Sequence, residues 1–371
     1  MVPLSVNKIM NKITKYPRNQ GRRIVLNLII RGLFRLLARV KVEGRQNIPK
    51  TGPVILAGNH VENLEAGFQI AFPKRIVEPI GAGDIPFGMG LDGLIAFYGF
   101  ISVDRGTVDR GALREAQSVL EQGAVLGIYP EGGTWRPGKM PAQIGVAMLS
   151  ERGKAPVVPI GYNGFNGSTK AAITFKRPKL TMRVGKPIPP LVIDPDGPPK
   201  KEQMQVYADE VMRQVYALLD EDELNVTPDH ESYKLHIKRS LDNQDYESLP
   251  PLEGADAFVS FINTVIILDT LRDSLSLPTQ CFYSGEDGQT LDNLIQGIDA
   301  TMNYLKEKPN FFTYRMGQQM GGEVPLALNN LRQLAIETKQ LNQTLLLDAE
   351  IEAKYRNGEV KHILHQFAFR P

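Results

Sequence analysis

The sequence predicts an α/β fold in which a mixed central β-sheet is flanked by helices. Short apolar runs that suit buried strands alternate with amphipathic helical patterns through residues 44–220. The chain has 371 residues, of which 42% are hydrophobic, so it can bury a large core and a second, smaller one. We expect three parts: a basic amphipathic two-helix segment over residues 1–43, the α/β domain over 44–220, and an acidic helical region over 221–371.

The N-terminal segment is the basic end of the chain. Residues 1–45 contain eleven Lys or Arg side chains and one acidic side chain, whereas the whole chain carries a net charge of +2. Apolar residues interleave with the basic ones, and the run Ile24–Ile30 leads into three arginines at four-residue intervals. The pattern predicts helices over 4–16 and 21–39 that lie in a membrane interface. A membrane-spanning helix is not expected, because each mid-helix arginine costs about 2.5 to 3.5 kcal/mol.

The partner implied by this segment is an anionic membrane surface. A basic amphipathic helix packed on its own domain is the alternative. Nucleic acid is not expected as a partner, since no aromatic platform or DNA-binding pattern accompanies the basic residues. No cleavable signal is evident, and the single cysteine, Cys281, fits a reducing compartment. We therefore expect a peripheral or monotopic protein at the cytoplasmic face of a membrane.

The elements of the α/β domain can be predicted in order along the chain. Strands are expected at residues 54–58, 75–80, 99–106, 124–129, 155–160, around 172–174 and at 180–184. Helices are expected at about 63–72, 109–122, 141–152 and 201–220. After residue 220 the alternation stops, and helical patterns cover about 254–276, 288–306 and 325–355.

The first candidate for chemistry is His60, which follows the apolar run Val54–Gly58 and should lie at the mouth of a buried strand. Glu65 comes five residues later. Residues five apart on one helix do not face each other, so the two meet only if His60 lies in the turn before a helix that carries Glu65. A histidine held by a carboxylate is a general base with a fixed tautomer. The alternative is a hydrogen-bonded structural histidine.

Cations and backbone donors follow two later strands. Arg105 and Arg136 can bind phosphate through forked, charge-assisted hydrogen bonds. Gly132 and Gly133, followed by Thr134, offer exposed backbone amides in a loop after a strand. The alternatives are a surface ion pair of Arg105 and an ordinary glycine turn.

Four segments resemble, in order, the motifs of the glycerophospholipid acyltransferase family, typified by 1-acyl-glycerol-3-phosphate acyltransferase. The first family motif is a histidine followed after four residues by an aspartate, and here it is Asn59-His60 with Glu65 in the aspartate's place. The other three correspond to Gly99–Arg105, to Pro130–Arg136 with an additional Gly133 and Trp135, and to Val157–Ile160. The resemblance covers roughly residues 20–220.

The resemblance implies an O-acyltransferase that moves a fatty acyl group from acyl-CoA or acyl carrier protein to a lysophospholipid-like acceptor such as 1-acyl-glycerol-3-phosphate. His60 would be the general base and Glu65 would orient it. Substrate would be bound by Arg105, Glu131, Gly132, Gly133, Thr134 and Arg136, with Glu131 ordering the loop or an arginine. No cofactor and no metal is expected. Because Glu65 lengthens the orienting arm by a methylene group, the alternative is an altered or inactive protein that serves as a lipid-binding scaffold.

Overall fold

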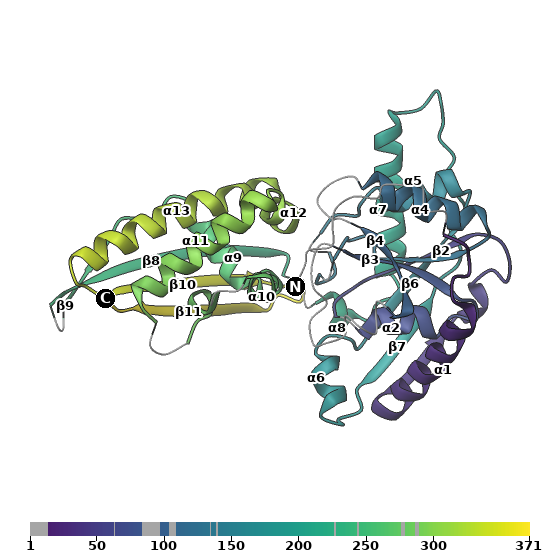
Figure 1. The fold of residues 1–371 in the computed structure, drawn as a ribbon, viewed down its shortest axis with the longest axis horizontal. Helices are drawn as coiled ribbons and strands as arrows, with labels where there is room; N and C mark the ends of the chain where they lie inside the picture. Colours follow the sequence, from purple (N-terminus) through teal and green to yellow (C-terminus); the bar gives the residue numbers. More distant parts are fainter. Residues whose placement is uncertain are drawn as a thin grey trace. The chain divides into compact units, whose positions relative to one another are not determined.

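The computed structural model describes residues 14–62, 64–83, 97–103, 109–133, 135–138, 140–225, 228–242, 245–275, 279–285 and 289–371. These residues fall into two compact units, one up to residue 225 and the other from Pro228 (Figure 1). The helix expected over residues 4–16 lies almost entirely outside the described residues. The helix expected over 21–39 is confirmed as α1 (Gln20–Leu37).

The first unit is built on a mixed sheet of seven strands, in the order β1-β7-β6-β2-β5-β3-β4. Neighbouring strands are parallel except for β6 and β7, which are antiparallel. The strands are β1 (Arg39–Glu43), β2 (Val54–Gly58), β3 (Val77–Ala82), β4 (Ile101–Val103), β5 (Val125–Ile128), β6 (Val157–Asn163) and β7 (Lys179–Val184). The predicted mixed sheet is therefore confirmed.

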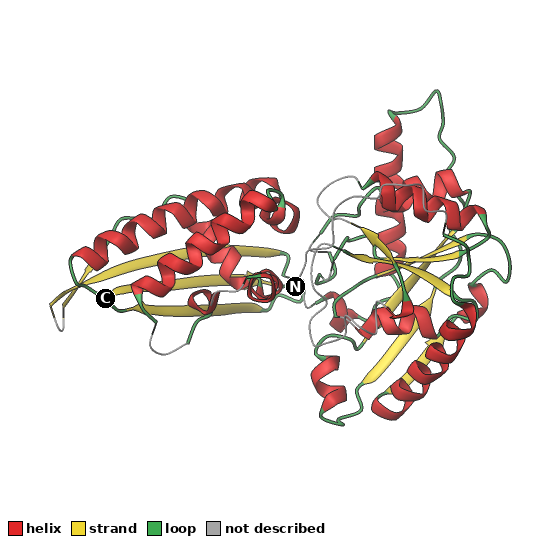
Figure 2. Ribbon diagram, viewed as in Figure 1, coloured by secondary structure: helices red, strands yellow, loops and turns green. Residues whose placement is uncertain are grey.

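Helices cover both faces of this sheet (Figures 1 and 2). Ile55 and Ala57 of β2 pack with the helices of one face, which are α4 (Arg110–Glu121), α5 (Gly145–Gly153) and α7 (Lys200–Tyr216). Val54 and Leu56 pack toward the other face, where α1 and α2 (Leu64–Ala71) lie. Because both faces are covered, every residue of β2 is apolar or glycine and buried. Short helices complete the unit: η1 (Arg45–Asn47), α6 (Ser168–Ile173) and α8 (Glu221–Leu224).

A buried ion pair fastens α1 to the sheet. Arg23 and Glu78 of β3 are both 0% exposed, and Arg23 donates from Nη1 to Glu78 Oε2 at 2.7 Å and from Nη2 to Oε1 at 3.1 Å. Arg23 also donates to the backbone oxygens of Tyr98 at 3.0 Å and Gly99 at 2.7 Å. Arg18 adds a second cation, with Nε 2.7 Å from Glu78 Oε1. Part of the basic charge of this segment therefore serves the packing of α1 onto the sheet.

The second unit is an antiparallel four-stranded sheet, in the order β11-β10-β8-β9, with helices on one face (Figure 2). Its strands are β8 (His230–Asp242), β9 (Asp245–Ser248), β10 (Leu345–Lys354) and β11 (Val360–Phe369). Its helices are α9 (Ala255–Asn263), α10 (Val265–Ser274), η2 (Thr279–Phe282), α11 (Leu291–Glu307), α12 (Phe311–Met316) and α13 (Gln318–Gln340). The expected helices of the C-terminal region are therefore present, and the sheet beside them was not predicted.

Two predicted elements differ from the structure, and one further strand was not predicted. The strand expected around residues 172–174 is wrong, because α6 and a turn occupy this stretch and Ile173 is exposed instead of facing a core. The helix expected over 325–355 is correct only as far as Gln340. β10 then begins at Leu345, where every second side chain is buried against the helices. β1 was not predicted, since the helical pattern was extended to residue 39.

Candidate functional site

The turn that carries His60 begins where β2 ends. Asn59 is fully buried, and its side-chain amide pairs with both backbone groups of Tyr162 on β6. Nδ2 donates to the Tyr162 oxygen at 3.1 Å, and Oδ1 accepts from the Tyr162 nitrogen at 2.8 Å. The amide thus continues the β2–β6 pairing by one residue beyond the strand. His60 leaves the sheet at its carboxyl edge, where parallel sheets hold ligands.

Glu65 lies on the first turn of α2 and reaches back to the His60 turn. Its Oε1 accepts the backbone N–H groups of Val61 and Glu62, each at 2.8 Å. Its Oε2 lies 4.0 Å from His60 Nδ1, with Glu65 fully buried and the His60 side chain 15% exposed. His60 therefore lies in the turn before the helix that carries Glu65, which is the arrangement that their spacing predicts. The added methylene of the glutamate is used to reach both the turn amides and the imidazole.

Burial sets the protonation of this carboxyl group. It raises the pKa of Glu65 to about 8, although the backbone N–H groups of residues 61, 62 and 65 favour the ionised form. The neutral acid is therefore the major form at pH 7. A positive charge on the neighbouring imidazole would favour the carboxylate.

Glu131 holds the same turn from the segment after β5. It is fully buried and accepts the His60 backbone N–H at 3.3 Å and the Tyr216 hydroxyl at 2.7 Å. Burial raises the pKa of Glu131 to about 8, against the effect of these hydrogen bonds. The His60 backbone oxygen accepts from the Trp135 N–H at 2.7 Å. Both backbone groups of His60 are thus fixed by the third motif segment, which agrees with an ordering role for Glu131.

Aromatic rings complete the surroundings of the imidazole. Tyr129 stacks on His60 with ring centroids 4.2 Å apart and planes 18° from parallel. Burial, neighbouring tyrosine and Glu65 raise the pKa of the Tyr129 hydroxyl well above its ordinary value. Burial and then Glu65 do the same for Tyr162. Sequence reasoning missed Tyr129, Tyr162 and Tyr216, and the only signal was that Tyr129 directly precedes the third motif.

The remaining predicted site residues have different outcomes. Gly132 lies in a turn with φ +76°, and its backbone N–H donates to the Tyr129 oxygen at 2.9 Å. Gly133 is buried. Arg136 is exposed just after this turn. Arg105 and Thr134 lie outside the described residues. Within the described ranges, no group of three or more His, Cys, Asp or Glu side chains is placed to hold a metal ion.

Glu65 Oε2 and Trp135 Nε1, near His60, are among the buried polar atoms that have no hydrogen-bond partner in the part of the chain that the structure describes. Such orphaned groups are uncommon in folded proteins and mark places where a ligand or a proton can be accommodated. The site thus combines an imidazole, an acid behind it and fixed backbone groups on either side. This set can take a proton from a hydroxyl and stabilise the resulting imidazolium.

The buried acid beside His60's backbone predicts a pH effect on stability. In Glu131→Gln the amide has the shape of the protonated acid but does not titrate. Since the folded-state pKa is raised from 4.5 to about 8, the folded protein holds this proton more tightly than the unfolded chain does. The contribution of Glu131 should be fully present below pH 4.5 and be lost as pH rises through about 8. Denaturant unfolding should show the stability of the wild type falling relative to Glu131→Gln over this range; a constant difference would contradict the assignment.

The chain is similar to known acyltransferases. Residues 39–163 match the protein family described as Acyltransferase. The chain is 24% identical over 159 residues to a 1-acyl-sn-glycerol-3-phosphate acyltransferase from Bacillus subtilis, covering 42% of this chain and 77% of the relative. A second enzyme of the same name, from Borreliella burgdorferi, is 30% identical over 99 residues, covering 25% of this chain and 38% of that protein.

A solved structure is also similar, that of the 1-acyl-sn-glycerophosphate (LPA) acyltransferase from Thermotoga maritima. It has a TM-score of 0.40 and 24% identity, covering 55% of this chain and 83% of that chain. The family match runs from β1 to β6 and includes His60, Glu65 and Glu131. Residues 39–163 of this chain therefore match an acyltransferase domain, which supports the family that the four motifs resemble.

Proposed function

We propose that this acyltransferase moves a fatty acyl group from acyl-CoA or acyl carrier protein to the hydroxyl of a lysophospholipid-like acceptor such as 1-acyl-glycerol-3-phosphate. The observation that carries the proposal is the pair of His60 and buried Glu65, with Nδ1 and Oε2 4.0 Å apart at the carboxyl edge of the sheet. The names of the Bacillus and Borreliella relatives support the choice of acceptor.

The reaction needs one base and no covalent enzyme intermediate. In the reactive form Glu65 is ionised and its carboxylate keeps the proton of His60 on Nδ1. His60 Nε2 then takes the proton of the acceptor hydroxyl as its oxygen attacks the thioester carbonyl, and the Glu65 carboxylate stabilises the imidazolium. The C–S bond then breaks, and the imidazolium returns the proton to the departing thiolate. The thioester is already activated, so a protein nucleophile is not required. Arg105, Arg136 and the amides at Gly133 and Thr134 are proposed to bind the phosphate of the acceptor, with Gly132 shaping the turn because its own N–H is bonded to the Tyr129 oxygen.

Removing the base should remove the activity. His60→Ala is expected to lower kcat by about 10² to 10⁴, the usual contribution of general base catalysis. The measurement is transfer from an acyl thioester to lysophosphatidic acid by the purified protein. His236→Ala, which changes an exposed histidine of the second unit, is the matched control. Equal turnover by wild type and His60→Ala would eliminate the mechanism.

The alternative function is a noncatalytic lipid-binding scaffold on the same fold, suggested by Glu65 in the place of aspartate. The contacts of Glu65 favour the enzyme, because its length is used in bridging the turn amides and the imidazole. Glu65→Asp should therefore lower activity, by about 10² for a misplacement near 1 Å. The same transfer assay discriminates: an inactive wild type whose Glu65→Asp variant gains activity would favour the scaffold.

The outer face of α1 supports action at a membrane surface. Its arginines 23 and 31 turn inward, whereas six apolar side chains face outward. The outward set, each between 46% and 65% exposed, is Ile24, Val25, Leu28, Ile29, Leu33 and Leu36. Solvent-exposed apolar stripes of this size indicate an interaction surface. No helix among the described residues is both long and apolar enough to cross a bilayer.

A second apolar patch lies next to the end of α1. Phe175 is 73% exposed and Ile173 is 58% exposed, in a turn whose neighbours are basic. Arg177 in this turn donates to the backbone oxygen of Arg35 at 3.1 Å, which places the turn beside α1. We propose that both patches meet the cytoplasmic face of an anionic membrane, with the protein peripheral or monotopic. The proposed transfer uses only residues of the first unit.

Charges placed on the outer face of α1 should release the protein from lipid. The double variant Ile29→Glu, Leu33→Glu is expected to lose most of its binding to anionic vesicles, because it removes apolar contact area and adds repulsion. Substitution is preferable to deleting residues 1–40, since Arg23 packs against Glu78 in the core. Val192→Glu, Val206→Glu is the control, since these exposed valines lie outside both patches. Cosedimentation that is equal for both double variants would contradict the membrane role.

A further inference from the structure

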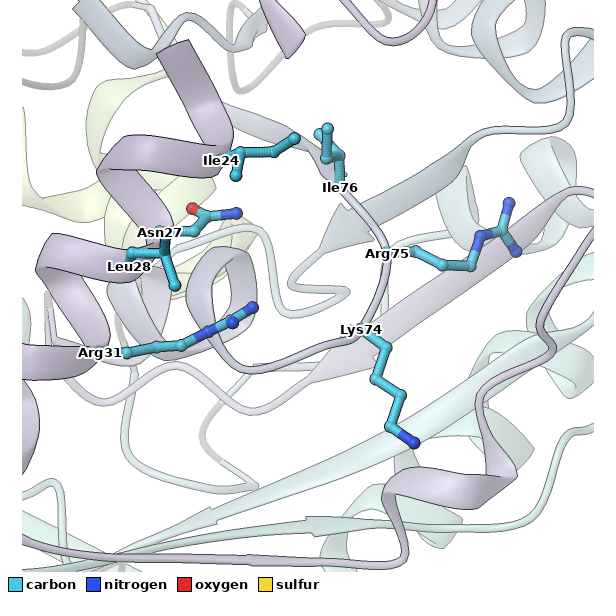
Figure 3. Close-up of a pocket in the computed structure, with 7 residues that line it drawn as sticks. All are labelled: Ile24, Asn27, Leu28, Arg31, Lys74, Arg75 and Ile76. Carbon is cyan, nitrogen blue, oxygen red and sulfur yellow. The ribbon is translucent and has the colours of Figure 1, made fainter. Parts of the chain in front are cut away.

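A pocket of about 160 Å³ lies between α1 and the segment that leads into β3 (Figure 3). It is lined by Ile24, Asn27, Leu28 and Arg31 of α1 and by Lys74, Arg75 and Ile76. This segment enters β3 at its amino end, whereas His60 follows the carboxyl end of β2. Because β2, β5 and β3 are parallel, the pocket lies at the opposite edge of the sheet from His60. It is therefore separate from the proposed catalytic site.

The cations of the pocket are held by neutral groups. Arg31 donates to the backbone oxygens of Ala71 and Pro73, the latter at 3.2 Å. Arg75 donates to those of Pro49 at 3.1 Å and Gly123 at 2.5 Å. None of the ion pairs found among the described residues involves Arg31, Lys74 or Arg75. Backbone oxygens orient a guanidinium but do not neutralise it. Arg31 extends from α1 toward the pocket, so its positive charge remains available to an anion there, whereas the side chains of Lys74 and Arg75 extend from their segment away from α1 (Figure 3).

Further arginines strengthen the positive potential on this side of α1. The pKa of Arg31 is lowered by burial and then by repulsion from Arg35. The pKa of Arg45 is lowered by burial and then by Arg31 and Arg35. Like charges this close raise the energy of the unliganded protein, and a bound anion would relieve it.

Asn27 gives the pocket a directed polar group. It is 5% exposed, and its Oδ1 has no hydrogen-bond partner in the described parts of the chain. Figure 3 shows Asn27 and Arg31 extending from α1 toward the segment of Lys74 and Ile76. A side-chain amide accepts from hydroxyl groups as well as donating to oxygens. Cations plus a buried amide fit a phosphodiester with a hydroxylated headgroup.

The apolar side chains that line the pocket favour a phospholipid over a soluble phosphate as its ligand. Ile24 and Leu28 line it and also belong to the outward stripe of α1, at 46% and 58% exposed. A ligand with its phosphate among the cations would thus have its hydrocarbon beside this stripe. We propose that the pocket binds the headgroup of an anionic membrane phospholipid that is not a substrate and that holds α1 at a defined position on the bilayer. This inference rests on the proposed membrane contact of α1.

The test compares the preference of the full chain for phosphatidylcholine vesicles with and without phosphatidylglycerol. Lys74→Gln should lower the preference for phosphatidylglycerol about fivefold, the usual contribution of one cation at a membrane surface. Asn27→Leu should also lower it severalfold, although the net charge is unchanged. Lys201→Gln, on an exposed position of α7, is the matched control and should stay near wild type. Thermal unfolding checks that each variant folds.

Three outcomes would overturn the site. The first outcome is that Asn27→Leu keeps the wild-type preference for phosphatidylglycerol, while Lys74→Gln and Lys201→Gln lose equally little of it. This result would mean that the lipid is attracted by the overall positive charge and not by the pocket. In the wild type, phosphatidylglycerol vesicles should protect the Lys74 amine from acetylation relative to Lys201, and no protection would overturn the proposal. Equal protection by inorganic phosphate alone would mean a soluble anion site.

The experiments distinguish a failure of the pocket proposal from a failure of the proposed membrane contact or of the proposed acyl transfer. A wild-type chain that binds no vesicles would remove the membrane contact together with the pocket's ligand. A chain that binds vesicles with an unaltered preference in Asn27→Leu would remove the pocket's role alone. His60→Ala should retain the wild-type lipid preference, so the loss of acyl transfer is scored independently of the pocket.

Discussion

The organisation of the first unit depends on two buried carboxyl groups that hold one turn. Glu65 binds the N–H groups of residues 61 and 62, and Glu131 binds the N–H of His60. One acid comes from the helix after the turn and the other from the segment after a neighbouring strand. Tyr129 stacks on the imidazole of His60, and the Trp135 N–H holds the His60 backbone oxygen, so this residue has little freedom. The preorganisation of the proposed base is thus built into the packing of β2, α2 and β5.

Burying these acids has an electrostatic consequence. An ionised carboxylate without a cation would be costly in this interior, and both groups respond by holding their protons more tightly. The cost is avoided as long as they stay neutral. In the proposed mechanism Glu65 releases its proton before the transfer, and its carboxylate then stabilises the imidazolium that forms on His60. The burial that raises the pKa of Glu65 also strengthens the attraction between its carboxylate and an imidazolium on His60.

The sequence predicts the first unit well because its local signals agree with one another. β2 has the predicted bounds, and α2 begins within a residue of its expected start, since an unbroken apolar run and a turn rich in Gly and Asn leave little choice. Prediction failed at β10, whose Ala, Leu, Glu and Lys residues are strong helix formers and whose alternation matters only beside a sheet. It also failed for α6, whose largest apolar residue, Ile173, faces outward. Glu131 could be predicted as a site residue from its motif. Its hydrogen bond to the His60 backbone could not be predicted, because it joins segments that are far apart in the sequence and meet only in the folded chain.

The arginine of α1 that is buried against Glu78 also limits how the first unit can move. One guanidinium ties α1 to β3 through two hydrogen bonds to Glu78 and to the segment before β4 through two more, so the helix cannot swing on a hinge while the sheet stays still. Whatever surface α1 settles on therefore fixes the tilt and height of the whole sheet. On the proposed membrane surface, encounters of His60 with lipid molecules would become a search in two dimensions, with rotation about one axis as the main remaining freedom of orientation.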